Sequence, residues 1–562
     1  MFGAGGGTSS YREVEDAEVI LLWGSNARET HPIFFHHVLV ALRRGARLYV
    51  VDPRATSSAA FAHRHLGIDV GGDIALANGM AAEILRAGLA DLSFVERATT
   101  GFADFAAHVS AISLAETAAA TGVPAALVAE AARDYASADR AMICWTLGIT
   151  EHHSAVDNVR SLINLALLTG HVGRYGSGLN PLRGQNNVQG GGDMGAIPNK
   201  YPGFQEVEDE TIRARFEAAW GVALPPRRGM HLSEMFDAMD EGRLRHLYVV
   251  GENPAASEAD VARARRLLSS RSFLVVQDLF LTATAALADV VLPAAAGFAE
   301  TEGTVTNSER RVQRVRRAVA PPGEARDDLV IVTELARRLG AAWPTPDAEA
   351  IWDEVRALSP MHAGMSYARL EAEGGLQWPC YDLSHPGETY LHSRLWADPV
   401  VGPKAPFAVV SAEAPIDALS EEFPIRLTTG RRLDSYNTGV QSGAYRSPLR
   451  RGEAIELCKA DAARLGLSEG DLARVASRRG SVLATVHVTE SLRPGLAFMT
   501  LHFPDEVDTN VLTLDTYDPK SGTAEFKATA VSVTRAEQAG PVSDANGSAT
   551  AEDASALVAG GA

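Results

Sequence analysis

The 562-residue sequence contains only three cysteines, Cys144, Cys380 and Cys458, and they lie far apart in the chain. No Cys-x-x-Cys pair occurs, so these residues cannot supply the thiolates that an iron–sulfur cluster needs. We therefore expect each cysteine to be a small apolar core residue. The histidine pairs at 36–37 and 152–153 lack Cys or His partners at zinc spacing, so we expect them on helix surfaces or lining a site. No metal ligand is predicted in this chain.

Positive charge is also scarce, because 70 acidic side chains against 52 lysines and arginines leave a formal net charge of −18. That excess argues against nucleic acid or an anionic membrane as a main partner. No uninterrupted apolar run is long enough to cross a bilayer, so we expect no membrane insertion. The N-terminal residues have neither the basic nor the long apolar character of a signal peptide. These absences together predict a cytoplasmic protein.

The chain does have the length and the 46% hydrophobic content of several folded domains. Since domains usually hold ~100–200 residues, we expect a first α/β unit at 1–190, a second at 191–412 and a small β-barrel at 413–535. The barrel prediction depends on short alternating segments such as 472–477, 481–488 and 496–500. The final residues, 536–562, carry no core residues and predict a disordered tail.

A mostly apolar run at 17–23 predicts a strand buried on both faces, as in parallel sheets. It ends at Gly24-Ser-Asn26, a helix follows, and a second strand at 46–51 ends at Asp52. This order is that of half a nucleotide-binding sheet, although the Gly-x-Gly-x-x-Gly fingerprint of NAD-binding folds is absent. Gly71-Gly-Asp73 opens a further helix, whose free N–H groups suit an anion or a capping acid.

The same pattern recurs later in the chain. A strand at 244–250 ends at Gly251-Glu-Asn253, a helix spans 257–268, and a strand at 272–276 ends at Gln277-Asp278. Two copies of strand, Gly-x-Asn turn, helix, strand and acid indicate an internal duplication, with two nucleotide halves or two related nucleotides. Chance similarity between two units of a common architecture is the alternative. The predicted fold class is therefore α/β, with two Rossmann-like units and a C-terminal barrel.

Two polar stretches stand out from this pattern. Residues 178–195, which read GLNPLRGQNNVQGGGDMG, combine glycines and carboxamides with Arg183. They predict a polar loop shaped for an anionic or heteroaromatic ligand, with an ordinary glycine-rich loop as the alternative. Residues 300–307 predict a second polar loop. The arginines that follow, at 310–317, predict a solvated face or ion-pair partners for the acidic excess.

Residues 179–190, with 193–198 and 201–203, closely resemble the catalytic alpha subunit of formate dehydrogenases in the molybdopterin oxidoreductase family. The resemblance runs from about residue 17 to 533. Its supporting motifs are Asn26 with Glu29-Thr-His-Pro32, Asp52-Pro-Arg54, Trp145-Thr-Leu-Gly148, Leu168–Gly173, Gly251-Glu-Asn-Pro254, Thr301–Thr304 with Asn307, Thr429-Gly-Arg431 and Tyr517-Asp-Pro519. The family binds two molybdopterin guanine dinucleotides around one molybdenum or tungsten, one on each α/β half, and its barrel is of the double-psi type.

The resemblance also implies roles for single residues. Arg183 would hold the formate carboxylate through bidentate bonds, with Gln185 and His152 as further catalytic candidates. The first dinucleotide would be lined by Asn26, Asp52, Arg54, Asp73, Leu147 and Gly148. The second would be lined by Asn253, Asp278, Gly430, Arg431, Asn510 and Lys527. Further cofactor-binding candidates are Glu29, His31, Gly184, Gly251, Gln277 and Thr429. Glu151 stands where the family often has Gln, and His152 or His153 would offset its charge.

Two features of the family are not in this sequence: the N-terminal iron–sulfur domain, and the Cys or selenocysteine before His that ligates the metal. Met1–Gly5 resembles the segment just after that residue, so we expect a mis-called start, with both features encoded upstream. An iron–sulfur cluster is expected only with such a domain.

The implied function is oxidation of formate to CO2, with partner subunits that carry iron–sulfur clusters or flavin. We expect the chain as given to be inactive. The alternatives are an inactive cofactor-binding fragment and an oxidoreductase for another small oxo-anion.

Overall fold

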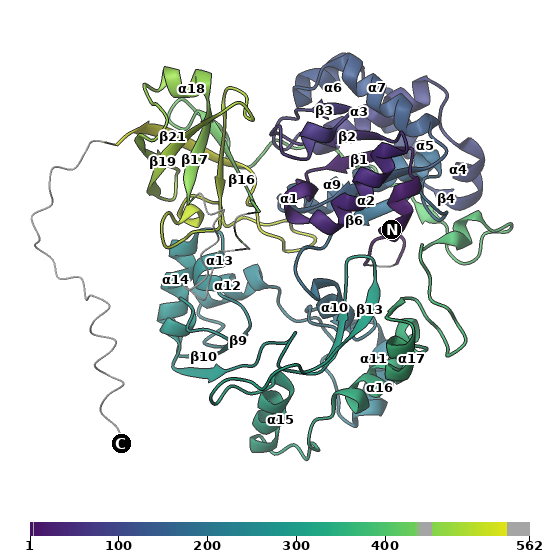
Figure 1. The fold of residues 1–562 in the computed structure, drawn as a ribbon, viewed down its shortest axis with the longest axis vertical. Helices are drawn as coiled ribbons and strands as arrows, with labels where there is room; N and C mark the ends of the chain where they lie inside the picture. The colour runs from purple at the N-terminus through teal and green to yellow at the C-terminus, as the bar shows by residue number, and fades with distance from the viewer. Residues whose placement is uncertain (4, 434, 436, 438–451, 537–562) are drawn as a thin grey trace, which may run out of the picture.

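The computed structural model describes residues 1–3, 5–433, 435, 437 and 452–536 (Figure 1). Its elements form a first α/β unit, a second α/β unit with an antiparallel extension, and a barrel. In Figure 1 the first unit and the barrel lie side by side, and the second unit lies beneath both. The predicted divisions at 190 and 412 stay predictions, and the predicted disordered tail lies, apart from Ala536, outside the described residues.

The first unit is built on a five-stranded parallel sheet in the order β3-β2-β1-β5-β6. Every residue of β1 and β5 is buried. Alternate residues serve opposite faces: Ile20 packs with Phe34 of α2, whereas Leu21 packs in the core that contains residues of α3, α7 and α9. The sheet strands are β1 (Val19–Trp23), β2 (Arg47–Val51), β3 (Arg64–Leu66), β5 (Ala141–Trp145) and β6 (Gly178–Pro181).

Local sequence signals mark two helix boundaries of this unit. The α7 helix covers the apolar segment after Pro124, and α9 ends before Gly170, whose φ is +68°. The helices are α1 (Ala27–Thr30), α2 (Pro32–Arg43), α3 (Asp73–Arg86), α4 (Leu92–Ala98), α5 (Phe102–Ser110), α6 (Leu114–Thr121), α7 (Ala125–Ser137), α8 (Leu147–Thr150) and α9 (Ala155–Thr169), with 3-10 turns η1 (Arg12–Asp16) and η2 (Ala59–Phe61) and strand β4 (Thr99–Thr100).

The prediction of a loop over 178–195 is wrong for two of its segments. Residues 178–181 form β6, which extends the first sheet beside β5, and residues 188–193 form the short helix α10 (Val188–Asp193). Residues 182–187, with Arg183, and the turn at 194–195 are irregular. Gly178 is required where it lies, because a Cβ there would be 2.1 Å from Oγ of Ser9.

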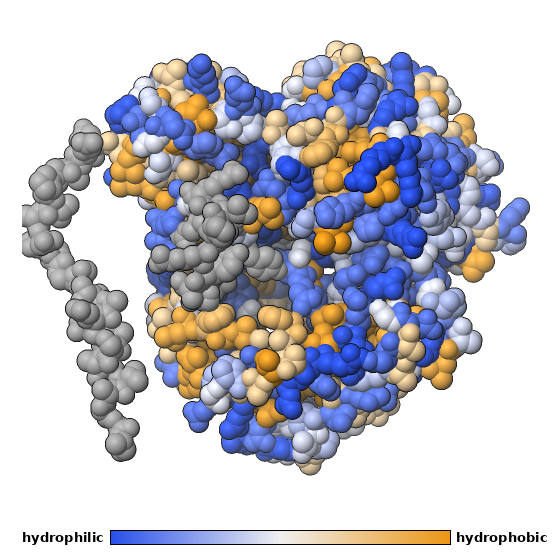
Figure 2. Space-filling view, in the orientation of Figure 1, coloured by the Kyte–Doolittle hydropathy of each residue, from blue (hydrophilic) through white to orange (hydrophobic). Residues whose placement is uncertain are grey.

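The second unit has a three-stranded parallel sheet, β11-β10-β9, and α12 and α14 cover one face of it. Its other face is partly open: Phe273 of β10 is 43% exposed and Val290 of β11 is 39% exposed. Figure 2 shows apolar surface gathered where β9 and β10 lie in Figure 1. The strands are β9 (His246–Val250), β10 (Phe273–Asp278) and β11 (Val290–Pro293), and the helices up to this sheet are α11 (Glu210–Trp220), α12 (Leu232–Asp240), α13 (Pro254–Ser257) and α14 (Val261–Ser270), with η3 (Ala285–Leu287).

An antiparallel sheet, β12-β13-β14, extends the second unit and overturns two predictions. The expected polar loop at 300–307 contains the strand β12, and Arg310 of the expected solvated face is fully buried. The Arg310 guanidinium donates to Gly7 O at 2.6 Å, to Glu388 O at 3.0 Å, to Thr389 O at 2.8 Å and to Trp378 O. Backbone carbonyls from distant segments therefore accept the hydrogen bonds of this buried guanidinium. Arg316 and Arg317 are exposed as predicted.

The remaining elements before the barrel are short. They are β7 (Lys200–Tyr201), β8 (Gln205–Glu206), β12 (Gly303–Thr306), β13 (Arg311–Val315), α15 (Asp328–Arg338), α16 (Ala348–Leu358), η4 (Pro360–His362), α17 (Tyr367–Ala372), β14 (Leu376–Gln377), η5 (Ser393–Trp396) and β15 (Ala405–Pro406). None of the helices in the described part of the chain has the length and apolarity of a bilayer span.

The predicted barrel is confirmed: six strands close in the order β16-β20-β17-β19-β18-β21. Two of its pairs, β16 with β20 and β17 with β19, are parallel. The strand at 454–458 was not predicted from the sequence. The elements are β16 (Ile425–Gly430), β17 (Ala454–Cys458), α18 (Lys459–Arg464), β18 (Leu472–Ala476), β19 (Ser481–Thr489), β20 (Leu496–Thr500), η6 (Thr509–Val511) and β21 (Thr529–Arg535).

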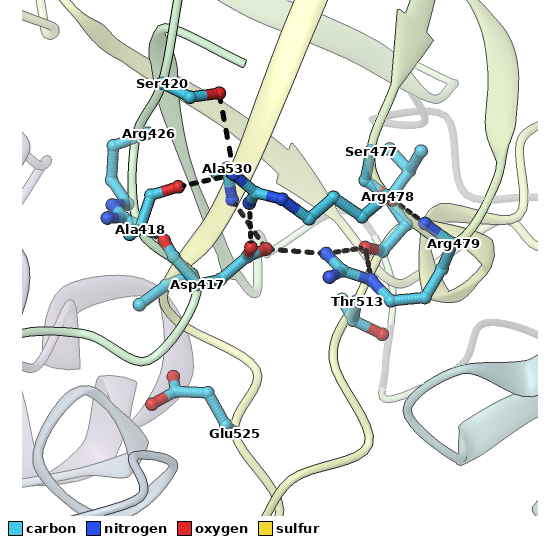
Figure 3. Close-up of polar contacts among 12 residues, drawn as sticks. Asp417, Ala418, Ser420, Arg426, Ser477, Arg478, Arg479, Thr513, Glu525 and Ala530 are labelled. Carbon is cyan, nitrogen blue, oxygen red and sulfur yellow. Dashed lines mark hydrogen bonds and ion pairs between the residues drawn. The ribbon is translucent and has the colours of Figure 1, made fainter. Parts of the chain in front are cut away.

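The buried carboxylate of Asp417 joins the segment before β16 to the rest of the barrel (Figure 3). Its Oδ2 accepts from Arg479 Nη2 at 2.6 Å and from Ala530 N at 3.0 Å, and its Oδ1 pairs with Arg478. Arg426 donates to the Asp417 carbonyl at 2.7 Å. Burial acts to raise the pKa of Asp417, but Arg479 and the other donors hold it below its usual value.

The predictions for cysteine are also confirmed. Cys144, Cys380 and Cys458 are buried, free, and packed in three separate hydrophobic clusters.

Candidate functional site

A cavity of about 680 Å³ lies where the two α/β units and the barrel meet. Gly24, Asp52, Thr146 and Leu182, each the residue after a strand of the first sheet, line one wall. The barrel supplies residues 428–433 and Lys527, and the loop after β10 supplies Phe280. Ligands of open parallel sheets bind beyond the carboxyl ends of the strands, so the cavity lies where this fold places ligands.

Most predicted site residues come together here. Those that line the cavity are Asn26, Glu29, His31, Asp52, Arg54, Asp73, Leu147, Gly148, His152, Arg183, Gly184, Gln185, Thr429, Gly430, Arg431 and Lys527. Those outside its walls are Gly251, Asn253, Gln277, Asp278 and Asn510. The resemblance assigned Gly430, Arg431 and Lys527 to the second dinucleotide, whereas the structure places them in the same cavity as Asn26 and Asp52.

Two glycine turns touch at the cavity wall. Gly148 N donates to Gly24 O at 3.1 Å, and a Cβ on Gly148 would lie 2.5 Å from that oxygen. Gly24 also has a φ of +56°, in the left-handed region that favours glycine. The backbone contact thus requires glycine at both turns and fixes how the ends of β1 and β5 present their side chains.

The Gly-x-Asn turns of the two units are built alike. In the first, Asn26 Oδ1 accepts from Ser58 N at 3.2 Å and from Ser58 Oγ at 2.9 Å. In the second, Asn253 Oδ1 accepts from Thr284 N at 3.0 Å and from Thr284 Oγ1 at 2.8 Å. The repeat predicted from the sequence therefore includes matching hydrogen bonds. In both turns the asparagine side-chain oxygen accepts hydrogen bonds from the protein itself.

Asn510 lies at the turn of the second unit. Its Nδ2 donates to Ala256 O at 3.1 Å and to Ser257 O at 3.3 Å, so it joins the barrel domain to α13.

Two buried acids line the wall formed by the first unit. Asp52 Oδ1 accepts from Arg54 N at 2.9 Å, and Asp73 Oδ1 accepts from Trp23 Nε1 at 2.8 Å. Burial raises the pKa of both carboxyls, and Arg54 opposes this at Asp52, as does His152 at Asp73. Asp73 also begins α3, where helix N–H groups favour negative charge. Such acids suit the N–H groups of a heteroaromatic ligand.

Cations from several elements face the same cavity. The Arg54 guanidinium lies 3.5 Å from the centre of the Phe498 ring, and Arg431 lies beyond the end of β16. Lys527 Nζ pairs with Glu151 Oε2 at 2.7 Å and donates to Thr429 O at 3.1 Å. The charge of Glu151, which the sequence analysis expected His152 or His153 to offset, is thus paired with Lys527.

His152 is buried and held at both ring nitrogens. Nε2 donates to Gly148 O at 3.1 Å, and Nδ1 lies 3.3 Å from Glu525 Oε1. Burial acts to lower the pKa of His152, but Glu525 more than offsets it and the pKa is raised. Burial likewise acts to raise the pKa of Glu525, yet His152 and His153 hold it well below its usual range. The result is a buried ion pair between the first unit and the barrel domain.

Arg183 lies on the segment between β6 and α10 and is exposed to the cavity. Its backbone N donates to Ser308 Oγ at 2.8 Å, its Nε to Gln189 Oε1 at 3.2 Å and its Nη2 to Gly5 O at 3.0 Å. Within the described residues these contacts leave the Nη1 hydrogens and one Nη2 hydrogen for a ligand. Gln185, beside it, donates to Asn437 Oδ1 at 3.1 Å.

Sequence reasoning missed Gln189 and Glu525. Gln189 could have been found, because it lies in the same motif as Arg183, six residues on. No pattern in the sequence around Glu525 marks it.

The fold and the cavity together define a class of protein. Two α/β nucleotide-type units and a barrel enclose one site whose cations, helix N-terminus and buried acids fit a large, anionic, heteroaromatic cofactor. Residues 4–338 match the family described as "Molybdopterin oxidoreductase", and residues 425–530 match the "Molydopterin dinucleotide binding domain". The chain belongs to the molybdopterin oxidoreductases, and the matched domain indicates a molybdopterin cofactor.

Relatives of known name agree with this assignment. The chain is 43% identical to F420-dependent formate dehydrogenase 2 subunit alpha of Methanococcus maripaludis, over 95% of this chain and 78% of that one. It is 32% identical to the assimilatory nitrate reductase catalytic subunit of Bacillus subtilis, over 95% of this chain and 76% of that one. Acetylene hydratase from Pelobacter acetylenicus shares the fold, with a TM-score of 0.70 at 20% identity over 94% of this chain and 79% of that structure.

Proposed function

We propose that this chain is a formate dehydrogenase catalytic subunit that converts formate to CO2, a proton and two electrons. The observation that carries the proposal is Arg183, which faces the cavity with N–H groups on adjacent nitrogens that no described residue engages. Such a guanidinium grips a planar carboxylate at two points, which a spherical or neutral ligand cannot exploit. The 43% identity to a formate dehydrogenase alpha subunit supports the same substrate.

Two molybdopterin guanine dinucleotides would lie against the two α/β units. The first would be held by Asn26, Asp52, Arg54, Asp73 and Gly148, and the cavity cations from the barrel would meet its phosphates. The second would be held by the turn of the second unit, through Asn253 and Asp278, with Asn510 beside it. When bound, the cofactor's molybdenum or tungsten supplies the electron acceptor for the reaction.

The protein's own residues would orient the substrate. Arg183 would hold the carboxylate, and Gln185 would limit where the remaining C–H bond points. His152, held by Gly148 and Glu525, would keep a fixed orientation in the cavity wall. Relatives are named as alpha subunits of F420-dependent formate dehydrogenases, so we propose electron-transfer partner subunits with iron–sulfur or flavin groups.

The test uses the protein expressed from its complete gene and loaded with cofactor, with an artificial electron acceptor and ¹³C-formate. The expected products are labelled CO2 and reduced acceptor, with turnover that requires the bound metal. Loaded protein that binds metal, reduces nitrate and leaves formate unchanged would contradict the proposal.

Reduction of another small oxo-anion is the second candidate, and the 32% identity to a nitrate reductase catalytic subunit favours it. Arg183 does not separate the two, because nitrate is planar and keeps two oxygens when one is removed, so a two-point grip suits either anion. The same assay decides, since each candidate predicts a different anion consumed.

A further inference from the structure

A buried row of hydrogen bonds stands behind Arg183. Gln189 Oε1 accepts from Arg183 Nε at 3.2 Å, and Gln189 Nε2 donates to Asp193 Oδ1 at 2.8 Å. Asp193 Oδ2 accepts from Trp378 Nε1 at 2.8 Å. Gln189 is 3% exposed, Asp193 is 1% exposed and Trp378 is 3% exposed, so water does not provide alternative partners. The row runs from α10 to the second unit and ends at the cavity.

The chemistry of these groups fixes the direction of every bond. The indole N–H of Trp378 can only donate, and an ionised carboxylate can only accept. Both oxygens of Asp193 therefore receive hydrogens, and the Gln189 amide must turn its NH2 group toward Asp193. Its oxygen is then left to face Arg183. Gly5 O strengthens this arrangement, because it accepts from Gln189 Nε2 at 3.3 Å and from Arg183 Nη2 at 3.0 Å.

We propose that Asp193 and Gln189 are positioning residues that set which hydrogens Arg183 presents to the substrate carboxylate. With Nε and one Nη2 hydrogen engaged by the protein, the guanidinium offers the cavity the edge formed by Nη1 and Nη2. That edge can bind both oxygens of a carboxylate. The inference rests on the proposed function for the identity of the anion, but the aim of Arg183 depends only on this chain.

Substitution of Asp193 by Asn reverses one bond in the row. The rigid indole of Trp378 cannot turn, so the oxygen of the introduced amide stays with it and the amide NH2 faces Gln189. Gln189 then flips and points its own NH2 at Arg183 Nε, which places two donors against each other. Arg183 has room in the cavity and swings away. The loss of the hydrogen bond between Arg183 and Gln189 therefore weakens the binding of substrate by Arg183.

A second substitution restores the polarity. In Asp193→Asn with Gln189→Glu, the oxygen of the introduced amide accepts from Trp378, and its NH2 donates to one oxygen of the introduced carboxylate. The other oxygen of that carboxylate accepts from Arg183. Only the contact with Gly5 O is lost, so we expect partial recovery. Asp104→Asn is the matched control, since Asp104 is exposed on α5, far from this row.

The experiment compares the loaded wild-type protein, Asp193→Asn, the double variant and Asp104→Asn. We expect Asp193→Asn to raise KM for formate roughly tenfold, with cofactor content and thermal midpoint retained, because one charge-assisted contact is weakened. The double variant should recover much of this loss, and Asp104→Asn should match the wild type. Crystal structures of the same proteins provide a readout without turnover: Arg183 should move in the single variant and return in the double.

Two results would overturn the inference. One is an unmoved Arg183 with unchanged formate kinetics in Asp193→Asn. The other is a double variant, folded and loaded, that resembles the single one in both readouts. A wild type that fails to oxidise formate refutes the proposed function instead, and the crystallographic comparison still decides on the positioning role.

Discussion

At the scale of single residues, Arg183 tests the substrate grip most directly. Arg183→Lys keeps the charge but replaces a planar fork by a point charge, so we expect kcat/KM for formate to fall about 100-fold. The thermal midpoint should change little, since Arg183 faces the cavity. Steady-state kinetics and thermal unfolding measure the two effects. Arg317→Lys, at an exposed position, is the control, and equal kinetics in both variants would remove Arg183 from the site.

Asp193 predicts a pH dependence. Burial raises its pKa to about 6, against the hydrogen bonds from Gln189 and Trp378 and the charges of Arg183 and Arg310. Below about pH 6 the carboxyl gains a proton and becomes a donor, so KM for formate should rise as pH falls.

The stability of the fold should rise as pH falls through this range, even though the binding of formate weakens. Because the folded pKa lies above the ordinary value of 3.8, ionised Asp193 costs the folded state about 3 kcal/mol, and protonation relieves that cost. KM for formate and the thermal midpoint are each measured from about pH 5 to about pH 8. Both should rise toward the acidic end of that range. Asp193→Asn should lack the inflection in KM, and an inflection that persists there would assign it to another group.

At the scale of elements, the pair of His152 and Glu525 joins the loop after α8 to the segment before β21. The raised pKa of His152 means that its contribution is complete below its ordinary pKa of 6.5 and is lost as pH rises through the raised value. The lowered pKa of Glu525 means that its contribution is complete above its ordinary pKa of 4.5 and is lost as pH falls through the lowered value. The pair is therefore strongest between those ordinary values.

Glu525→Gln should destabilise the fold by about 3 kcal/mol within that window, because it leaves a buried imidazolium without its carboxylate. Thermal unfolding across pH measures this. The difference from wild type should shrink as pH rises and His152 loses its proton. A constant difference at every pH would show that Glu525 acts through packing alone.

Elements were predictable where local pattern and tertiary environment agree. The strands at 19–23 and 141–145 are apolar on both faces because helices cover both, and Gly170 marks the end of α9. The prediction failed at β12, whose residues alternate without a hydrophobic face, and at Arg310. A guanidinium can be buried only if distant carbonyls reach it, and sequence spacing does not show that Gly7 and Trp378 do so. Glu525 was missed for the same reason.

At the scale of the whole molecule, the two α/β units share the same order of strands, turns and helices but differ in how far their sheets are buried. Parallel sheets are normally buried on both faces, as the first is, whereas β9 and β11 of the second are partly exposed. We expect amides of β9 and β11 to exchange hydrogen faster than those of β1 and β5. Exchange monitored by mass spectrometry compares them within one molecule. Equal protection of the two sheets would mean that the open face does not lower local stability.

The cavity walls come from segments far apart in the sequence, since Gly24 and Lys527 both line it. A chain that emerges from the ribosome folds its N-terminal domain first. The first sheet can thus form early, but the site stays open on one side until residues near 527 have been made and the barrel has closed. A molybdopterin cofactor can therefore be enclosed only after synthesis of the chain has passed Lys527.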